Sequence, residues 1–244
     1  MGTKVDTRLS PSLHPGVIGS VIESVPAEHR TALAPVVESA RVMVSAIYAD
    51  LGRLHDLHDK LSADETRTPA ARTLELSKAA ESVFKRAAAQ LDARTDQLRD
   101  EIASLAATLA EPLQPKPGDA LGGEIRAFLR GLPDDKRVAA VAAAVDSGDT
   151  VTAIAALSAP GYLVGLSTEM KTALTAEWHR RQNPAAAARL EALTALRDKL
   201  MAFGALLFGA LQRAVGADPR AVESLRAKAD AASAAVRAVT APAA

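Results

Sequence analysis

Cysteine is absent from this chain of 244 residues, and aromatic side chains make up only 3% of it. Without cysteine the chain can form no disulfide bond, no thiolate nucleophile and no cysteine-based zinc site. The scarcity of rings argues against a thick core of large side chains, because alanine and leucine supply most of the 48% hydrophobic share. This composition favours helices that approach each other closely.

A net charge is also lacking, because 29 basic side chains balance 29 acidic ones. No overall field therefore directs the chain toward nucleic acid or acidic membranes, and we predict neither as a partner. The N-terminal sequence has no continuous apolar segment of the kind found in secretory signals. The most apolar stretch, Leu200–Leu211, is shorter than the ~20 residues that span a bilayer, so we interpret it as a buried helix.

Apolar residues recur every three or four positions over long stretches, and no stretch alternates as a β-strand would. The pattern after Pro35 predicts a helix to about residue 61, and a second helix is expected from Pro69 to about residue 110. A third long helix should begin at Pro184 and a final one at Pro219. We therefore predict an all-α fold: a long antiparallel helical hairpin or bundle with a small helical subdomain.

Prolines, glycines and caps predict how the chain is divided. Residues 1–30 break helical patterns repeatedly, which predicts an extended N-terminal arm. The rest divides into a long hairpin (31–111), a Pro/Gly linker (112–123), a small helical domain (124–183) and C-terminal helices that pack with the hairpin (184–244). In the small domain we expect Ser167 to cap a helix, and Phe128, Tyr162 and Trp178 to form the core.

The long helices carry continuous apolar seams, and we expect these seams to contact other copies of the chain. A spacing of alternately three and four residues is typical of helices that pack side by side. On the second helix the seam includes Phe84, Ala88 and Leu91. The residues predicted to form subunit contacts are Val44, Ile47, Leu51, Leu54, His58, Leu98, Ile102, Leu105, Leu109, Phe203 and Leu207.

The segment LGRLHDLHDK, residues 51–60, raises the question of a metal or acid–base site. His55 lies three residues from His58 and four from Asp59, so their side chains can converge on one helical face. A zinc site needs three or four ligands, however, and the other histidines lie in unrelated elements. We expect His58 to be a hydrogen-bonded seam residue, and we predict no metal and no cofactor.

Motifs for catalysis are missing as well. The chain has no G-x-S-x-G motif and no phosphate-binding G-x-x-x-x-G-K-[ST]. Asp134 and Asp135 follow Leu-Pro at an expected helix start, where the helix dipole accounts for them. The cluster EWHRRQ places Arg180 and Arg181 beside Trp178, a combination that can contact nucleic acid, although acidic neighbours favour salt bridges. We predict no enzymatic activity and no small-molecule substrate.

The segment FLRGLPDDKRVAAVAAAVDSGDTVTAIAALSAPGYLVGLSTEMKTALTAEWHRRQNP, residues 128–184, contains the pattern sGD…aALs.P.fLsGLs. It resembles a module of helical proteins encoded among the virion genes of tailed bacteriophages. The resemblance covers about a quarter of the chain and brings no catalytic residues. It implies a structural or accessory virion protein, assembled in the host cytoplasm, whose partners are copies of itself and other virion proteins.

Two interpretations of the function stay open. In the first, the chain is a non-enzymatic assembly protein of the head, head–tail junction or tail, or otherwise of the cytoplasm, and acts through helix–helix contacts. In the alternative, it is an internal or ejected phage protein that contacts DNA through Arg180 and Arg181, or a membrane through Leu200–Leu211. A purely structural subunit should bind neither DNA nor liposomes. Measurements of DNA binding and of liposome binding therefore separate the two interpretations.

Overall fold

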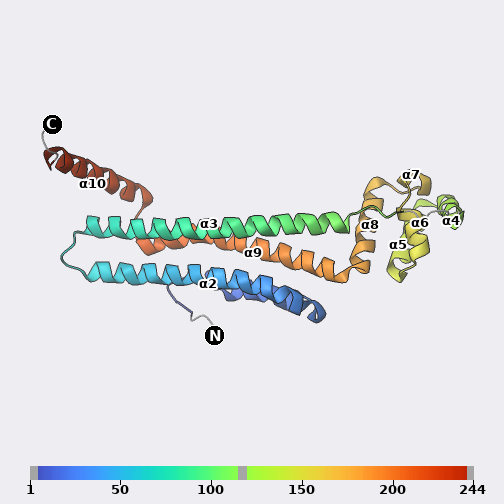
Figure 1. Ribbon diagram of the computed structural model, residues 1–244, viewed down its shortest axis with the longest axis horizontal. Coiled ribbons are helices and arrows are strands. Elements are labelled where there is room, and N and C mark those ends of the chain that lie inside the picture. The colour runs from blue at the N-terminus through green and yellow to red at the C-terminus, as the bar shows by residue number, and fades with distance from the viewer. Residues whose placement is uncertain (1–4, 115–119, 241–244) are drawn as a thin grey trace. The chain divides into compact units, whose positions relative to one another are not determined.

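The computed structural model describes residues 5–114 and 120–240, and every regular element within them is helical (Figure 1). The prediction of an all-α fold is therefore confirmed. The four long helices are α2 (Ala27–Ala63), α3 (Pro69–Leu109), α9 (Pro184–Val215) and α10 (Pro219–Thr240). The shorter ones are α4 (Ala120–Gly131), α5 (Asp134–Ser147), α6 (Thr150–Leu157), α7 (Gly161–Val164) and α8 (Thr168–Gln182).

The chain packs as two compact units. Of the described residues, those within 1–98 and 194–244 form unit 1, and those within 99–193 form unit 2. The chain passes from unit 1 into unit 2 within α3 and returns within α9, so neither crossing falls in a loop.

In unit 1, α2 and α3 are joined by residues 64–68 and contact each other in antiparallel order. Arg86 pairs with Asp50 at 3.3 Å, and Arg94 Nη2 donates to the carbonyl oxygen of Val36 at 3.2 Å. The later residue of α3 thus meets the earlier residue of α2, as a hairpin requires. Helix α2 begins at Ala27, before the predicted start at Pro35, and this proline lies inside the helix.

The core of unit 1 is a nearly aliphatic seam shared by α2, α3 and α9. On α3 this seam uses Val83 and Ala87, whereas the predicted Phe84 lies one residue further on and is 39% exposed. A valine and an alanine let α3 approach its neighbours more closely than a phenylalanine would. The buried residues include Val37, Ala40, Val44, Ile47, Leu51, Leu54, Leu76, Ala80, Val83, Ala87, Leu91, Leu196, Leu200, Phe203, Leu207, Ala210 and Ala214.

Residues 5–24 fold back on α2, so the prediction of an extended N-terminal arm is wrong for them. They form the short turns η1 (Pro11–Leu13), α1 (Gly16–Gly19) and η2 (Ser20–Ser24), and both α1 and η2 contact α2. The prolines and glycines that prevent a long helix still permit short turns, and these turns bury apolar side chains. The buried residues are Leu9, Leu13, Ile18 and Val21, and Val25, which directly follows η2, is buried as well.

Unit 2 contains short helices whose ends are set by turn residues. Gly148, with φ of 73°, ends α5, and the Asp149 carboxylate then caps α6. Gly165, with φ of 78°, ends α7, and Ser167 Oγ accepts the N–H of Met170 at 3.2 Å to cap α8. The left-handed conformation favours glycine, since a Cβ would be strained there.

The core of unit 2 contains Trp178, which is 4% exposed, but not the other two rings predicted for it. Phe128 is 66% exposed and Tyr162 is 78% exposed, because the neighbouring Leu129 and Val164 occupy the buried faces of α4 and α7. The buried members of this core are Leu129, Val141, Val145, Ala153, Ala156, Leu157, Ala159, Val164, Leu166 and Trp178.

The predicted linker, residues 112–123, is shorter than expected at its C-terminal end. Residues 120–123 already belong to α4. Residues 115–119 lie outside the described part of the chain. The two glycines at positions 122 and 123 therefore lie within a helix, despite the low helix propensity of glycine.

Candidate functional site

The aspartates of the HDLHDK segment hold the N-terminal residues against α2. Arg8 Nη1 lies 2.8 Å from a carboxylate oxygen of Asp56 and 3.4 Å from one of Asp59. Arg8 Nη2 pairs with Asp6 at 2.7 Å, and the Asp6 N–H donates to Tyr48 Oη at 2.9 Å. We call these five residues the N-terminal latch.

The latch shifts the pKa of the groups in and beside it. Hydrogen bonds from the Arg8 side chain lower the pKa of Asp6 to about 2, and the Asp6 and Asp56 carboxylates raise the pKa of Arg8. Burial lowers the pKa of His55, and the positive charge of Arg8 adds to this effect. Both effects favour the neutral form of the His55 imidazole.

His58 bonds the end of another helix in unit 1. Its Nδ1 lies 3.0 Å from the carbonyl oxygen of Ala214, in the last turn of α9. Carbonyl groups in the last turn of a helix have no partner within the helix, so a histidine donor there satisfies one of them. The hydrogen bond of His58 is thus internal to the chain. Gly216, with φ of 69°, ends α9 next to this ring.

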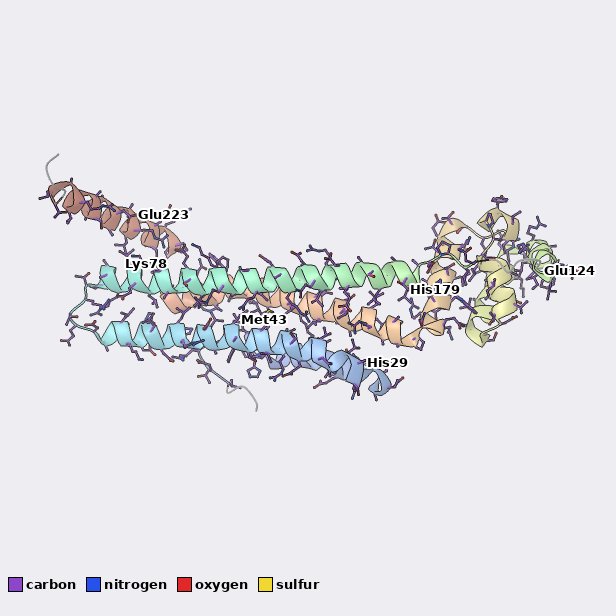
Figure 2. All side chains as sticks on the ribbon, in the orientation of Figure 1. His29, Met43, Lys78, Glu124, His179 and Glu223 are labelled. Carbon is purple, nitrogen blue, oxygen red and sulfur yellow. The ribbon has the colours of Figure 1, made fainter. Side chains whose placement is uncertain are left out.

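The histidines do not converge on a metal site. Within residues 5–114 and 120–240, no group of three or more His, Cys, Asp or Glu side chains is placed to hold a metal ion. His55 lies beside the latch, and His58 bonds α9. In unit 2, His179 Nε2 lies 2.6 Å from the carbonyl oxygen of Glu111 (Figure 2).

The basic–aromatic cluster on α8 is held in ion pairs. Arg180 pairs with Glu177, and Arg181 pairs with Glu177 at 2.9 Å and with Asp146 at 2.8 Å. The Trp178 ring is buried and offers no stacking surface. The two arginines proposed to touch DNA are therefore already close to carboxylates.

Unit 2 also contains a buried arginine that no sequence pattern indicated. Arg137 Nε donates to the carbonyl oxygen of Leu129 at 2.9 Å, and its Nη atoms donate to those of Leu132 and Gly165, both at 2.7 Å. Asp134 pairs with the same guanidinium at 2.8 Å. Arg137 thus connects the ends of α4 and α7, which is a structural role.

Most residues predicted to contact other copies are buried within the chain itself. His58, Ile102 and Leu105 are partly buried, and the other eight are at most 8% exposed. The prediction of subunit contacts is corrected for these eight, because the chain's own helices supply the partners of each seam. They are Val44, Ile47, Leu51, Leu54, Leu98, Leu109, Phe203 and Leu207.

The exposed apolar side chains are a different set. Of the seven aromatic residues in the chain, four are exposed: Phe84, Phe128, Tyr162 and Phe208, at 39%, 66%, 78% and 55%. For Phe84 and Phe208 the signal was that each directly follows a buried aliphatic residue, Val83 and Leu207. A ring that directly follows a seam residue on a helix points away from the seam.

A cavity of about 340 Å³ in unit 1 lies against two of these rings. Phe84 and Phe208 meet edge to face on its wall, with ring centroids 6.2 Å apart. The first turns of α10 supply further lining residues, including Val222 and Arg226. The cavity therefore lies where α10 leaves α3 and α9.

Two apolar segments meet the length and composition needed to cross a membrane. Helix α2 does so alone, and α9 with α10 does so as a pair bent by 59°. Core helices often meet the same test, and the seam of α2 is buried in unit 1. Within residues 200–211, Leu200 and Leu207 are buried, whereas Met201 and Phe208 are more than half exposed.

Comparisons with protein-family models, with curated proteins and with solved structures gave no match.

Proposed function

We propose that the chain is a non-enzymatic structural protein that assembles with copies of itself through exposed aromatic side chains. The observation that supports this most directly is that four of its seven aromatic residues are exposed, although the chain has few of them. Aromatic residues are enriched at the energetic centres of protein interfaces, and exposed apolar patches often mark interaction sites. The aliphatic seams account for folding, so the exposed rings are available for association.

Phe128 and Tyr162 in unit 2 are the best candidates for this contact. They are the most exposed of the four rings, and their helices α4 and α7 contact each other. Burying both rings against a second copy would remove a large apolar area from water. A C2 dimer is the simplest assembly, because it uses the same surface on both copies.

The wider setting we propose is a tailed-phage virion, as a component of the head, head–tail junction or tail. The support for this is the resemblance over residues 128–184, which includes both exposed rings of unit 2. The quoted pattern contains Gly148, Asp149, Gly165 and Ser167, all of which end or cap helices. Neighbouring genes for head or tail proteins would support a virion component, and a metabolic gene cluster would contradict it.

A double variant tests the self-association. Sedimentation velocity over a concentration series should show the wild-type chain associating, and Phe128→Ala/Tyr162→Ala should weaken the association at least ~10-fold. Val42→Ala is the matched control, since Val42 is an exposed apolar residue of unit 1 at 55%. A wild-type chain that stays monomeric, or a double variant that associates unchanged, contradicts the proposal.

The DNA- or membrane-contacting alternative has less support, because Arg180 and Arg181 are in ion pairs and the seam of α9 is buried. We expect no retention of DNA in filter binding at physiological salt and no flotation with liposomes. DNA binding that is lost in Arg180→Ala/Arg181→Ala would favour the alternative.

A further inference from the structure

The C-terminal half of α9 in unit 1 is apolar on all sides. Residues 200–212 contain no charged side chain, although charged residues make up 24% of the chain. On one side of this stretch, Leu200, Phe203 and Leu207 are buried in the seam. The other side is apolar as well, and a helix that is hydrophobic all round is typical of one with neighbours on every side.

The exposed side of this stretch is what we call the α9 outer face. Met201 is 58% exposed, Phe208 55% and Leu206 40%. On α3, by contrast, the exposed positions that follow Phe84 are charged, as in Lys85 and Arg86. An exposed apolar patch of this kind often marks an interaction site. The members of the α9 outer face are Met201, Ala202, Ala205, Leu206, Phe208 and Gly209.

Small residues run along the middle of the α9 outer face. Ala202, Ala205 and Gly209 are spaced by three and four residues, so they lie along one line of the helix. A Cβ at Gly209 would meet the flexible end of Arg213 at 3.5 Å, so packing within unit 1 does not require glycine there. Glycine lowers the stability of a helix relative to alanine, and the close approach of a second helix would account for it.

Opposite charges lie at the two ends of this line. Asp198 lies four residues before Ala202, and Arg213 lies four residues after Gly209. Asp198 pairs with the adjacent Arg197 at 2.7 Å, whereas Arg213 has no ion pair within the described residues. The line thus runs from a carboxylate, through small apolar residues, to an unpaired guanidinium.

The α9 outer face is complementary to itself in antiparallel orientation. When two copies of α9 pair about Ala205, Asp198 lies within one residue of the height of the partner's Arg213. Met201 likewise lies within one residue of the height of the partner's Phe208. A parallel pair would instead place each charged residue beside its own copy, and like charges repel.

We propose that the α9 outer face is a contact between copies of the chain, in which two α9 helices pack antiparallel about a two-fold axis at Ala205. A second copy is the occupant that the charges favour, because it brings the opposite charge to each end of the line. Such a contact is isologous, since both copies use the same surface. The small residues near the axis allow the two helices to approach closely.

This contact makes the assembly larger than a dimer. A separate contact is already proposed for Phe128 and Tyr162 of unit 2, and this consequence rests on that proposed function. A chain with two isologous surfaces joins copies into open chains or closed rings, whereas one such surface stops at a dimer. The α9 contact itself does not depend on the rings of unit 2.

Single cysteines test the pairing, because the chain has no cysteine of its own. Ala205→Cys places two thiols opposite each other on the two-fold axis, and oxidation should yield a covalent dimer, since a disulfide needs Cα atoms about 4.4–6.8 Å apart. Gln212→Cys is the matched control. Gln212 lies two turns further along α9, and the antiparallel pair separates its two copies by about 21 Å. Cross-linking at both positions, or at neither, would overturn the proposal.

A charge on the two-fold axis should disrupt the contact. In the background Phe128→Ala/Tyr162→Ala, which removes the contact of unit 2, sedimentation velocity should show dimers. Adding Ala205→Arg should weaken these dimers at least ~10-fold, because two guanidinium groups then meet on the axis. Ala89→Arg, the same change at an exposed position of α3, is the control and should leave the dimers unchanged. Monomers in the background variant, or dimers that persist with Ala205→Arg, would overturn the α9 contact.

Failure of the α9 contact and failure of the unit 2 contact give different results. If the unit 2 contact were wrong, the wild-type chain would form only dimers, and Ala205→Arg by itself would give monomers. If the α9 contact were wrong, Phe128→Ala/Tyr162→Ala by itself would give monomers.

Charge reversal tests the orientation. Asp198→Arg or Arg213→Asp should each weaken the α9 dimer about two- to ten-fold, because the antiparallel pair holds two Asp198–Arg213 contacts. The double variant should restore the dimer. Lys228→Glu, a charge reversal at an exposed position of α10, is the control. A double variant that associates no more tightly than the single variants would overturn the antiparallel pairing.

Lipid vesicles distinguish a second copy from a membrane as the occupant. Vesicles of neutral and anionic phospholipid should not float the chain, since another copy covers the α9 outer face. Flotation that Ala205→Arg abolishes would overturn the assignment to a second copy.

Discussion

The two units reach stability by different means. Unit 1 relies on long seams, in which many leucine, valine and alanine side chains repeat the same contact along α2, α3 and α9. Unit 2 has short helices, and its shape depends on particular residues: two glycines with positive φ, two caps and the buried Arg137. The difference teaches that periodicity determines a long bundle, whereas turn chemistry determines a small domain of short helices.

The largest effect should come from a cavity in the seam of unit 1. Leu51 is 0% exposed, and Leu51→Ala should cost about 2–5 kcal/mol of unfolding free energy. The single tryptophan, Trp178, lies in the core of unit 2, so its fluorescence reports on that unit while circular dichroism reports all helices. We expect Leu51→Ala to shift the unfolding midpoint measured by circular dichroism more than the midpoint measured by Trp178 fluorescence. Leu57→Ala, at a partly exposed position of α2, is the control, and equal shifts would show that the units unfold together.

The next largest effect should come from removing the guanidinium of unit 2. Arg137→Ala leaves the carbonyl groups of Leu129, Leu132 and Gly165 without their donor and should cost about 2–4 kcal/mol. The unfolding free energy of Arg137→Lys should lie between those of wild type and Arg137→Ala, because an ammonium lacks the planar guanidinium group that reaches several acceptors. Denaturant unfolding followed by Trp178 fluorescence measures the change. If Arg137→Ala were as stable as wild type, the proposed stabilising role of Arg137 in unit 2 would be wrong.

Two glycines of unit 2 separate backbone strain from crowding. Both Gly148 and Gly165 have positive φ, so alanine at either should cost about 1–2 kcal/mol. A Cβ at Gly165 would also lie 2.6 Å from Arg137 Nη1, whereas nothing lies within 4 Å of one at Gly148. We therefore expect Gly165→Ala to lower the melting temperature more than Gly148→Ala. A smaller decrease in melting temperature for Gly165→Ala than for Gly148→Ala would mean that the Arg137 guanidinium moves aside without loss of stability.

The smallest effect should appear in acid, at the latch of unit 1. The folded pKa of Asp6, about 2, lies below its ordinary value of 3.8, so its ion pair stabilises the fold above about pH 4. This stability is lost as the pH falls from about 4 to 2. Because Arg8 is 38% exposed, the loss should stay under about 1 kcal/mol. Unfolding free energies of wild type and Asp6→Asn should converge toward pH 2, and a constant difference would contradict the role of the latch.

Much of unit 1 could be predicted from the sequence, because its helices repeat one contact. The spacing of Val37, Val44, Leu51 and Leu54 indicated a buried face, and all four are buried. What the spacing leaves open is which surface covers that face. A seam closed by α9 and a seam closed by a second copy have the same pattern, which is why the predicted subunit contacts were corrected.

In unit 2 and at the N-terminus, local sequence signals predicted where helices begin but not which side chains are buried. Ser167 caps α8 as predicted, because capping depends on a few adjacent residues. The exposure of Phe128 and Tyr162, and the burial of Arg137, depend on contacts between helices distant in sequence, which no local pattern contains. Similarly, the prolines and glycines of residues 5–24 show that a long helix is absent, but not that Leu13 and Ile18 are buried.

The double passage of the chain between the units, through α3 and then through α9, has a consequence for synthesis. The α2–α3 hairpin leaves the ribosome long before residues 196–214, which complete its seam. The part of unit 2 that follows α3 is translated in that interval, so unit 2 can fold while the hairpin still exposes its leucines. A nascent chain paused near residue 193 should therefore attract chaperones through residues that the finished protein hides.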